Sequence, residues 1–103
     1  MVLANELEAA ALGPMLSPTQ LGGALVIVKQ GADPAIVMAA GMPPREVPAL
    51  VVPDVHDTTG AGDAFAAGLL LSLAAGADAV TATLAGHRVA AEAVRFASVS
   101  ADA

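Results

Sequence analysis

Residues 57–65 constrain the fold and the chemistry of this chain more than any other part of its sequence. They read Asp-Thr-Thr-Gly-Ala-Gly-Asp-Ala-Phe and join a turn of small residues to an apolar helix. Gly60 and Gly62 permit backbone conformations that a side chain would forbid, so that consecutive N–H groups can converge on an anion. The helix that follows adds its positive end. Asp63 lies in the first turn of that helix, and the segment therefore predicts a general base beside an anion site.

Parts of this segment also have a plainer interpretation. A Gly-x-Gly-Asp turn before an apolar helix is also a simple helix start with an Asp in its first turn. Asp57 would orient the turn or assist a metal-bound water, but an Asp before Thr-Thr is also an ordinary turn former. The functional interpretation therefore depends on the whole segment and not on its glycines alone.

The whole segment resembles, without a gap, the signature near the C-terminal end of sugar and nucleoside kinases of the ribokinase (PfkB) family. The resemblance implies that Gly60, Ala61 and Gly62 stabilise charge on the transferred phosphoryl group. It implies that Asp63 takes the proton from the acceptor hydroxyl, that ATP and Mg²⁺ are the cofactors, and that Thr58 is a nucleotide contact. Phosphoryl transfer mainly requires positioning, charge stabilisation and a base near the attacking oxygen, which agrees with these residues.

Near the start of the chain, residues 5–8 resemble the Asn-x-x-Glu element of the same family. The resemblance implies that Glu8 acts on the magnesium ion through ordered water, with Asn5 as its companion and Asp57 as a further metal-side residue. A cation that keeps most of its waters needs only one or two such carboxylates. The alternative is that Asn5 and Glu8 only cap a helix, which is the more common role of this spacing.

Residues 28–35 resemble the strand-to-loop segment that runs along the nucleotide in the family. Lys29 and Gly31 are its candidates for contact with phosphate or ribose, although Lys29 is equally a solvated residue at a strand end. Pro34 stands where the family usually has a second Gly. Because Pro has no N–H, any backbone hydrogen bond that the family makes there is lost.

His87 occupies the place where family members often have Asn or His beside the adenine. A neutral imidazole stacks on a base or hydrogen-bonds to its edge. A lone His on a helix is more often structural, so that both interpretations stay open. His56 is interpreted as a loop residue. With two His and no Cys, the sequence predicts no zinc site.

The pattern of the remaining sequence predicts an α/β fold. Helices are expected at residues 5–12, from residue 17 or 19 to residue 21, at residues 62–75 and at residues 78–96. Strands are expected at residues 24–28, 35–38 and 47–52. The first strand is a β-branched run typical of a parallel sheet buried on both faces, and Pro48 makes the last an edge strand or delays its start.

The signature loop is expected at the mouth of the sheet, where ligands of α/β folds bind. By resemblance, the fold is the C-terminal part of the ribokinase-like three-layer α/β/α fold.

The charge and hydropathy of the chain argue against nucleic-acid-binding and membrane proteins. A net charge of −6 with only four Lys plus Arg leaves no basic patch, so nucleic acid is not an expected partner. The longest uncharged run lies between Asp63 and Asp78 and is shorter than the ~20 apolar residues that span a bilayer, so no membrane association is expected. The absence of Cys and of a secretory signal fits a cytoplasmic location.

We interpret residues 1–103 as one partial PfkB-type kinase domain, the nucleotide-binding third, because the family's sugar-binding Gly-Gly element and lid have no counterpart here. A base without a positioned hydroxyl loses an orientation term of ~7–11 kcal/mol, so little activity is expected from the isolated chain. Exposed strand edges and apolar helix faces favour association with itself or with a missing N-terminal half. The acceptor, a sugar or a nucleoside, stays open. The alternative is a non-catalytic nucleotide-binding or interaction fragment.

Overall fold

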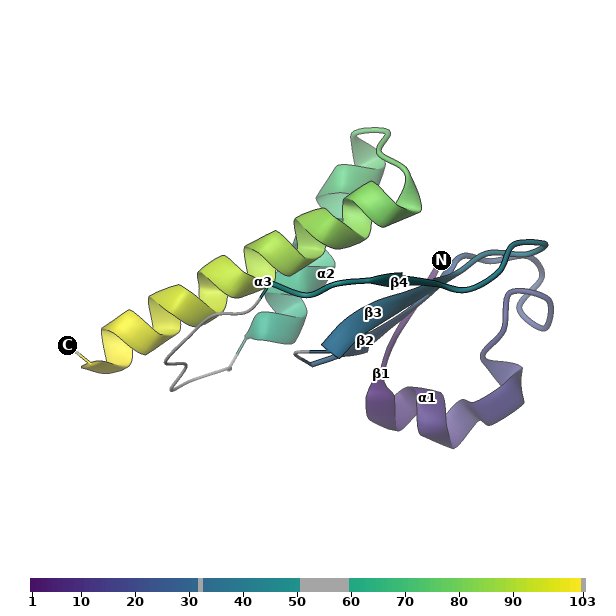
Figure 1. The fold of residues 1–103 in the computed structure, drawn as a ribbon, viewed down its shortest axis with the longest axis horizontal. Helices are drawn as coiled ribbons and strands as arrows, with labels where there is room; N and C mark the ends of the chain where they lie inside the picture. Colours follow the sequence, from purple (N-terminus) through teal and green to yellow (C-terminus); the bar gives the residue numbers. More distant parts are fainter. Residues whose placement is uncertain (32, 51–59, 103) are drawn as a thin grey trace. The chain divides into compact units, whose positions relative to one another are not determined.

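The computed structural model describes residues 1–31, 33–50 and 60–102, with side chains up to residue 94. The chain divides into two compact units, Met1–Pro48 and Ala49–Ala103. The first holds a sheet with one short helix, and the second holds two long helices (Figure 1). The elements along the chain are β1 (Val2–Asn5), α1 (Glu6–Leu12), a 3₁₀ turn (Gly13–Met15), β2 (Val26–Gln30), β3 (Asp33–Met38), β4 (Arg45–Val47), α2 (Ala61–Ala74) and α3 (Ala79–Asp102).

The described strands form one mixed sheet in the order β1-β2-β3-β4. β1 runs parallel to β2, whereas β2–β3 and β3–β4 are antiparallel pairs. The α/β class is confirmed, but the expectation of a parallel sheet holds only for the β1–β2 pair. The reason is local: Gly31 has a φ of 59° and turns the chain from β2 directly back into β3, a conformation that Gly adopts at little cost.

Three elements differ from the sequence prediction. β1 was not expected, because its four residues immediately precede a strong helix start. The strand predicted at residues 47–52 is wrong at residues 48–50: β4 ends at Val47, and Pro48, which cannot donate to a ladder, follows it. Residues 51 and 52 lie outside the described part of the chain. The helix predicted at residues 17–21 is also wrong, because this segment forms turns in which the Leu21 N–H donates to the Ser17 carbonyl at 3.0 Å.

The core of the first unit lies between α1 and one face of the sheet. Ala4, Leu16, Val26 and Val28 are buried together there. Because successive residues of a strand point to opposite faces, Ile27 and Val37 lie on the other face, and they are buried as well. β2 is therefore apolar on both faces, as its β-branched sequence predicts.

The second unit is a hairpin of two helices. α2 ends in a Schellman motif: Gly76, with a φ of 95°, donates to the Leu73 carbonyl at 3.0 Å, and the Ala77 N–H donates to the Ser72 carbonyl at 3.1 Å. Asp78 then caps α3 by accepting a 2.8 Å hydrogen bond from the Thr81 N–H. Both predicted helices are confirmed, with α3 continuing to Asp102 beyond its expected end.

Glycines bring the two helices unusually close. A Cβ on Gly86 of α3 would lie 2.8 Å from the Phe65 carbonyl oxygen and 2.9 Å from two carbons of its ring. A Cβ on Gly68 of α2 would lie 2.8 Å from Val89 Cγ2. Such distances do not occur for real Cβ atoms, so each helix contributes one glycine that allows the contact. The buried face of α3 comprises Ala82, Thr83, Gly86, His87, Ala90, Ala91 and Val94.

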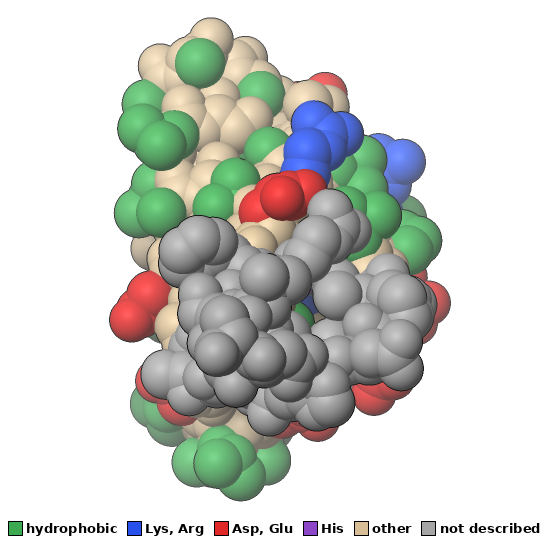
Figure 2. All heavy atoms as spheres, turned by 90° about the vertical axis from the view of Figure 1, so that its left-hand side faces the viewer, with side chains coloured by type: hydrophobic (Ala, Val, Ile, Leu, Met, Phe, Trp, Pro, Cys, Tyr) green, Lys and Arg blue, Asp and Glu red, His purple; other side chains and the backbone are tan. Residues whose placement is uncertain are grey.

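No helix among the described residues has the length and apolarity that a bilayer crossing requires. Several large apolar side chains are nevertheless exposed, among them Leu7 at 82% and Leu71 at 73%. On the face drawn in Figure 2, Asp and Glu side chains (red) lie at separate places, and Lys and Arg side chains (blue) are few. The association expected from exposed apolar faces stays a prediction.

Candidate active site

The start of α2 forms the turn that the sequence singles out, residues 60–63, called the 60–63 turn below. Gly60 has a left-handed φ of 83° and its carbonyl accepts a 2.9 Å hydrogen bond from the Ala64 N–H. The first N–H groups of a helix have no acceptor within it, and a glycine cap has no side chain to supply one. The turn therefore presents backbone donors at the positive end of a helix of 14 residues.

The space beside these donors is open. A Cβ built on Gly62 would have no described atom within 4 Å, and Asp63 is exposed in the same first turn. Packing among the described residues therefore gives no reason for a glycine at position 62, whereas close approach of a ligand to the backbone does. Thr58 and Asp57 lie outside the described residues, and their predicted roles stay predictions.

Asn5 and Glu8 form a complete capping box at the start of α1. The Glu8 N–H donates to Asn5 Oδ1 at 2.8 Å, and the Asn5 N–H donates to Glu8 Oε1 at 2.9 Å. The capping interpretation is confirmed, and the metal-side role is a separate prediction. A carboxylate has a second oxygen, and Glu8 is exposed, so that capping leaves a hard oxygen donor facing solvent. Among the described residues, no three His, Cys, Asp or Glu side chains group as direct metal ligands.

Lys29 lies at the end of β2 and folds over the hairpin turn that follows. Its ammonium donates a hydrogen bond to the Gly31 carbonyl. Partial burial lowers the pKa of Lys29 from its usual 10.5, while the negative charges of Glu6 and Asp33 oppose that shift. Lys29 thus stabilises the turn between β2 and β3, and contact of Lys29 or Gly31 with a nucleotide stays a prediction.

Pro34, which replaces an expected glycine, lies inside β3. Its carbonyl accepts a 2.8 Å hydrogen bond from Gln30 Nε2, which ties the two strands together beside the turn. The proline has no N–H to donate to the sheet, and it fixes the backbone where the family pattern has a flexible residue.

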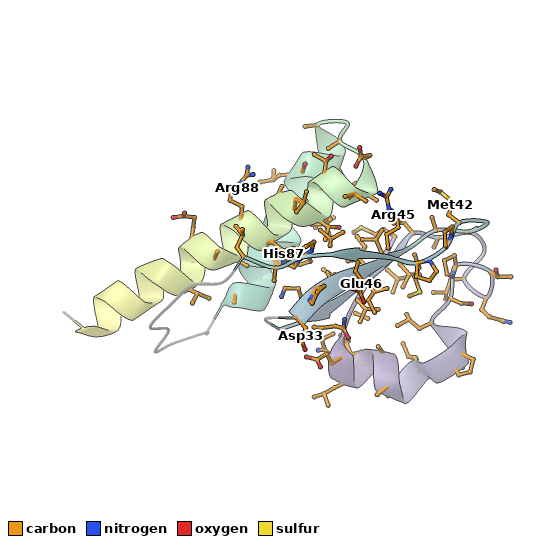
Figure 3. All side chains as sticks on the ribbon, in the orientation of Figure 1. Asp33, Met42, Arg45, Glu46, His87 and Arg88 are labelled. Atoms are coloured by element: carbon orange, nitrogen blue, oxygen red, sulfur yellow. The ribbon has the colours of Figure 1, made fainter. Side chains whose placement is uncertain are left out.

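His87 lies on the buried face of α3 and is only 2% exposed. Its ring centroid lies 5.1 Å from that of Phe65, with the ring planes at 55°. Figure 3 shows His87 and its neighbour Arg88 on opposite sides of α3. The ring contact provides a structural role, and contact of His87 with an adenine stays a prediction.

Within each unit the structure brings part of the predicted site together. Asn5 meets Glu8 and Lys29 meets Gly31 in the first unit. The second unit holds the 60–63 turn. Two participants were not singled out from the sequence. Phe65 ends the signature segment and Gly86 precedes His87, but only the pairing of α2 with α3 makes them neighbours.

Comparison with known proteins is consistent with these features. The family model described as pfkB family carbohydrate kinase matches residues 3–102. A 2-dehydro-3-deoxygluconokinase of Escherichia coli is 41% identical over 73 residues, which cover 69% of this chain and 24% of that protein. An adenosine kinase of Schizophyllum commune is 35% identical over 92 residues, covering 85% of this chain and 26% of that protein.

The fold of this chain is also similar to the folds of solved structures. The adenosine kinase from Schistosoma mansoni in complex with 2-fluoroadenosine superposes with a TM-score of 0.75 at 27% sequence identity. The match covers 90% of this chain and 33% of that structure. The chain thus spans about a quarter to a third of the length of the proteins it matches.

Proposed function

Because this chain belongs to the pfkB family of carbohydrate kinases, we propose that it is the phosphoryl-transfer part of an ATP-dependent kinase acting on a hydroxyl group of a sugar or nucleoside. The observation that carries the proposal is the 60–63 turn. It combines a left-handed glycine cap, backbone donors at a helix start, open space at Gly62 and the exposed carboxylate of Asp63. Family membership makes ATP the expected phosphoryl donor.

The proposed chemistry follows from this arrangement. The carboxylate of Asp63 takes the proton from the acceptor hydroxyl. At the same time, the oxygen of that hydroxyl forms a bond to the γ-phosphorus of ATP. The bond between the γ-phosphorus and the bridging oxygen breaks, and ADP leaves with the electron pair. The N–H groups of Ala61, Gly62 and Asp63 donate to the oxygens of the transferred group, where negative charge is concentrated in the transition state.

Mg²⁺ is proposed as the second cofactor. Glu8 fits an outer-shell role because it is exposed and capping occupies only one of its oxygens, and Asn5 holds it in place. When bound, the ion would neutralise charge on the phosphate oxygens. Asp57 is proposed on the same side of the phosphates from the sequence alone.

Two classes of acceptor are compatible with the proposal. The relatives are named as kinases of a ketodeoxy sugar acid and of adenosine. Both acceptors present an alcohol, which is all that the base requires. Thr58, Lys29, Gly31 and His87 are proposed contacts of the nucleotide that donates the phosphoryl group.

Calorimetric titration with Mg-ATP tests the proposal on the 103-residue chain. We expect binding by the wild type and none by Gly62→Asp, because the new carboxylate occupies the open space beside the donors and repels phosphate. Ala67→Asp is the matched control: it adds the same charge to an exposed position of the same helix, away from the turn.

The two variants separate the possible outcomes. Loss of binding in Gly62→Asp with retention in Ala67→Asp supports the phosphate site. A wild-type chain that is folded by circular dichroism and binds no ATP rejects it. Binding without transfer is expected of the isolated chain, because it lacks a part that positions the acceptor hydroxyl. Transfer is therefore measured after the chain is joined to the N-terminal part of a family kinase, and binding without transfer by that completed protein would favour the non-catalytic nucleotide-binding function.

A further inference from the structure

The 60–63 turn carries the proposed chemistry, yet among the described residues no side chain caps it. Its cap is Gly60, which has no side chain. Hydrogen-bond donors aimed at an anion act well only if they are held in place before the anion arrives. Contacts other than a side-chain cap must therefore fix the position of this turn.

Phe65 supplies the connection. It follows Asp63 by two residues, so that its backbone belongs to the same opening turns of α2. It is 1% exposed and is among the largest fully buried side chains described. Its ring centroid lies 5.1 Å from the ring centroid of His87 on α3. Phe65 also packs against Gly86 of α3, which has no side chain.

The contact with Gly86 differs in kind from an ordinary side-chain contact. A Cβ at position 86 would meet the backbone carbonyl oxygen of Phe65 at 2.8 Å, as well as two ring carbons at 2.9 Å. A ring can change its rotamer, but a carbonyl within a helix moves only with the helix. A side chain at position 86 would therefore displace the start of α2 itself.

We propose that Gly86 is a positioning residue for the phosphate site: by admitting the backbone and ring of Phe65, it fixes where the 60–63 turn holds its N–H donors and the Asp63 carboxylate. This inference rests on the proposed function for its chemical meaning. Its structural content, that the Gly86–Phe65 contact sets the geometry of residues 60–63, is independent of any ligand.

Gly68 provides the matched control. It lies at the reciprocal close approach of the same helix pair, where a Cβ built on it would lie 2.8 Å from Val89 Cγ2 and 3.0 Å from the Ala85 carbonyl oxygen. It lies about one helical turn after Phe65, farther from the 60–63 turn. An alanine at either glycine overpacks the helix pair, but only the one at position 86 presses on the residues that open α2.

The test compares Gly86→Ala with Gly68→Ala in the ¹⁵N-labelled chain. We expect the amide resonances of Gly62 and Asp63 to move in Gly86→Ala and to stay near their wild-type positions in Gly68→Ala. We also expect Mg-ATP to bind about tenfold more weakly to Gly86→Ala at equal folded fraction, the loss typical of one misaligned hydrogen bond to a charged group. Equal shifts in the two variants, or none in Gly86→Ala, would overturn the inference.

Two further measurements distinguish failure of the inference from a variant that does not fold and from a wild type that binds no ATP. If Gly86→Ala does not fold, Phe65→Leu, which removes the ring from the same contact, is compared with Leu69→Val, which trims an equally buried side chain one turn later. A wild type that binds no ATP overturns the proposed function and the functional part of this inference, while the amide comparison still decides the structural part.

Discussion

Gly68 of α2 lies so close to Val89 of α3 that a Cβ on the glycine would come within 2.8 Å of Val89 Cγ2 and 3.0 Å of the Ala85 carbonyl oxygen. Valine has a stiff side chain and the carbonyl is part of a helix, so neither neighbour yields easily. The close approach of the two helices therefore depends on this glycine.

Gly68→Ala should destabilise the chain. Alanine is the better helix former by about 1 kcal/mol, but overpacking a well-fitted contact costs about 1–3 kcal/mol, so we expect a net loss of up to about 2 kcal/mol. Urea denaturation followed by circular dichroism measures the change. An unchanged or raised free energy of unfolding would show that the helices separate at no cost.

Gly62→Ala should raise the free energy of unfolding and weaken the binding of Mg-ATP. Position 62 is helical and no described atom lies near the added methyl group, so helix propensity alone predicts a gain of a few tenths to about 1 kcal/mol. The methyl group would occupy the space in which a phosphate approaches the backbone. Denaturation and Mg-ATP titration of the same sample check both effects, and tight binding by this variant would contradict the proposed site.

Asp63→Asn should separate binding from transfer. Removing a negative charge beside the proposed phosphate site leaves ATP binding unchanged or tighter, since like charges repel. Loss of the base lowers phosphoryl transfer by about 10²–10⁴-fold. Calorimetry measures ATP binding, and release of ADP with sugar and nucleoside acceptors measures transfer, both in the chain completed with the N-terminal part of a family kinase. Transfer at the wild-type rate would remove Asp63 from the mechanism.

Glu8→Gln should separate capping from the metal role. Glutamine also closes a capping box, so the free energy of unfolding should change by less than about 0.5 kcal/mol, whereas Asn5→Ala should lose about 1 kcal/mol. If Glu8 acts on Mg²⁺, Glu8→Gln should nevertheless require more magnesium for the same ATP affinity. Identical magnesium dependence in the variant and the wild type would leave Glu8 with its capping role alone.

Lys29 should make stability rise with alkaline pH. Its pKa in the folded chain is lowered by burial, whereas the unfolded chain keeps a value near 10.5. Between these two values the unfolded state binds more protons, so the free energy of unfolding increases with pH, by less than about 1.4 kcal/mol per pH unit. Lys29 is the chain's only lysine, and Tyr and Cys are absent. Lys29→Met should therefore remove the alkaline slope that ends near the unfolded value of 10.5, as urea denaturation at several pH values would reveal.

Elements with local signals were predictable from the sequence. Asn5 identifies the start of α1 through a capping side chain, and Gly76 identifies the end of α2 because a left-handed residue stops a helix there. The 60–63 turn was found in the same way, from residues adjacent in the sequence. Such signals act within a few residues and need no knowledge of the rest of the fold.

Features that depend on distant pairing were not predictable. β1 becomes a strand only because Val2 pairs with Val26, far along the chain, and Asn5 serves both as its last residue and as the cap of α1. The role of Gly86 is likewise invisible until α3 lies beside α2. In both cases the determining contact is tertiary, and it overrides or adds to the local preference.

The contact between Gly86 and Phe65 also gives the chain a built-in spectroscopic probe. The chain has no Trp or Tyr and only two Phe, so few aromatic rings contribute to the magnetic environment of its nuclei. The Cα protons of Gly86 lie against the ring of Phe65 and should show a ring-current shift as long as the two helices are docked. Following that single glycine resonance during a titration or a thermal ramp would report the integrity of the helix pair without any label or substitution.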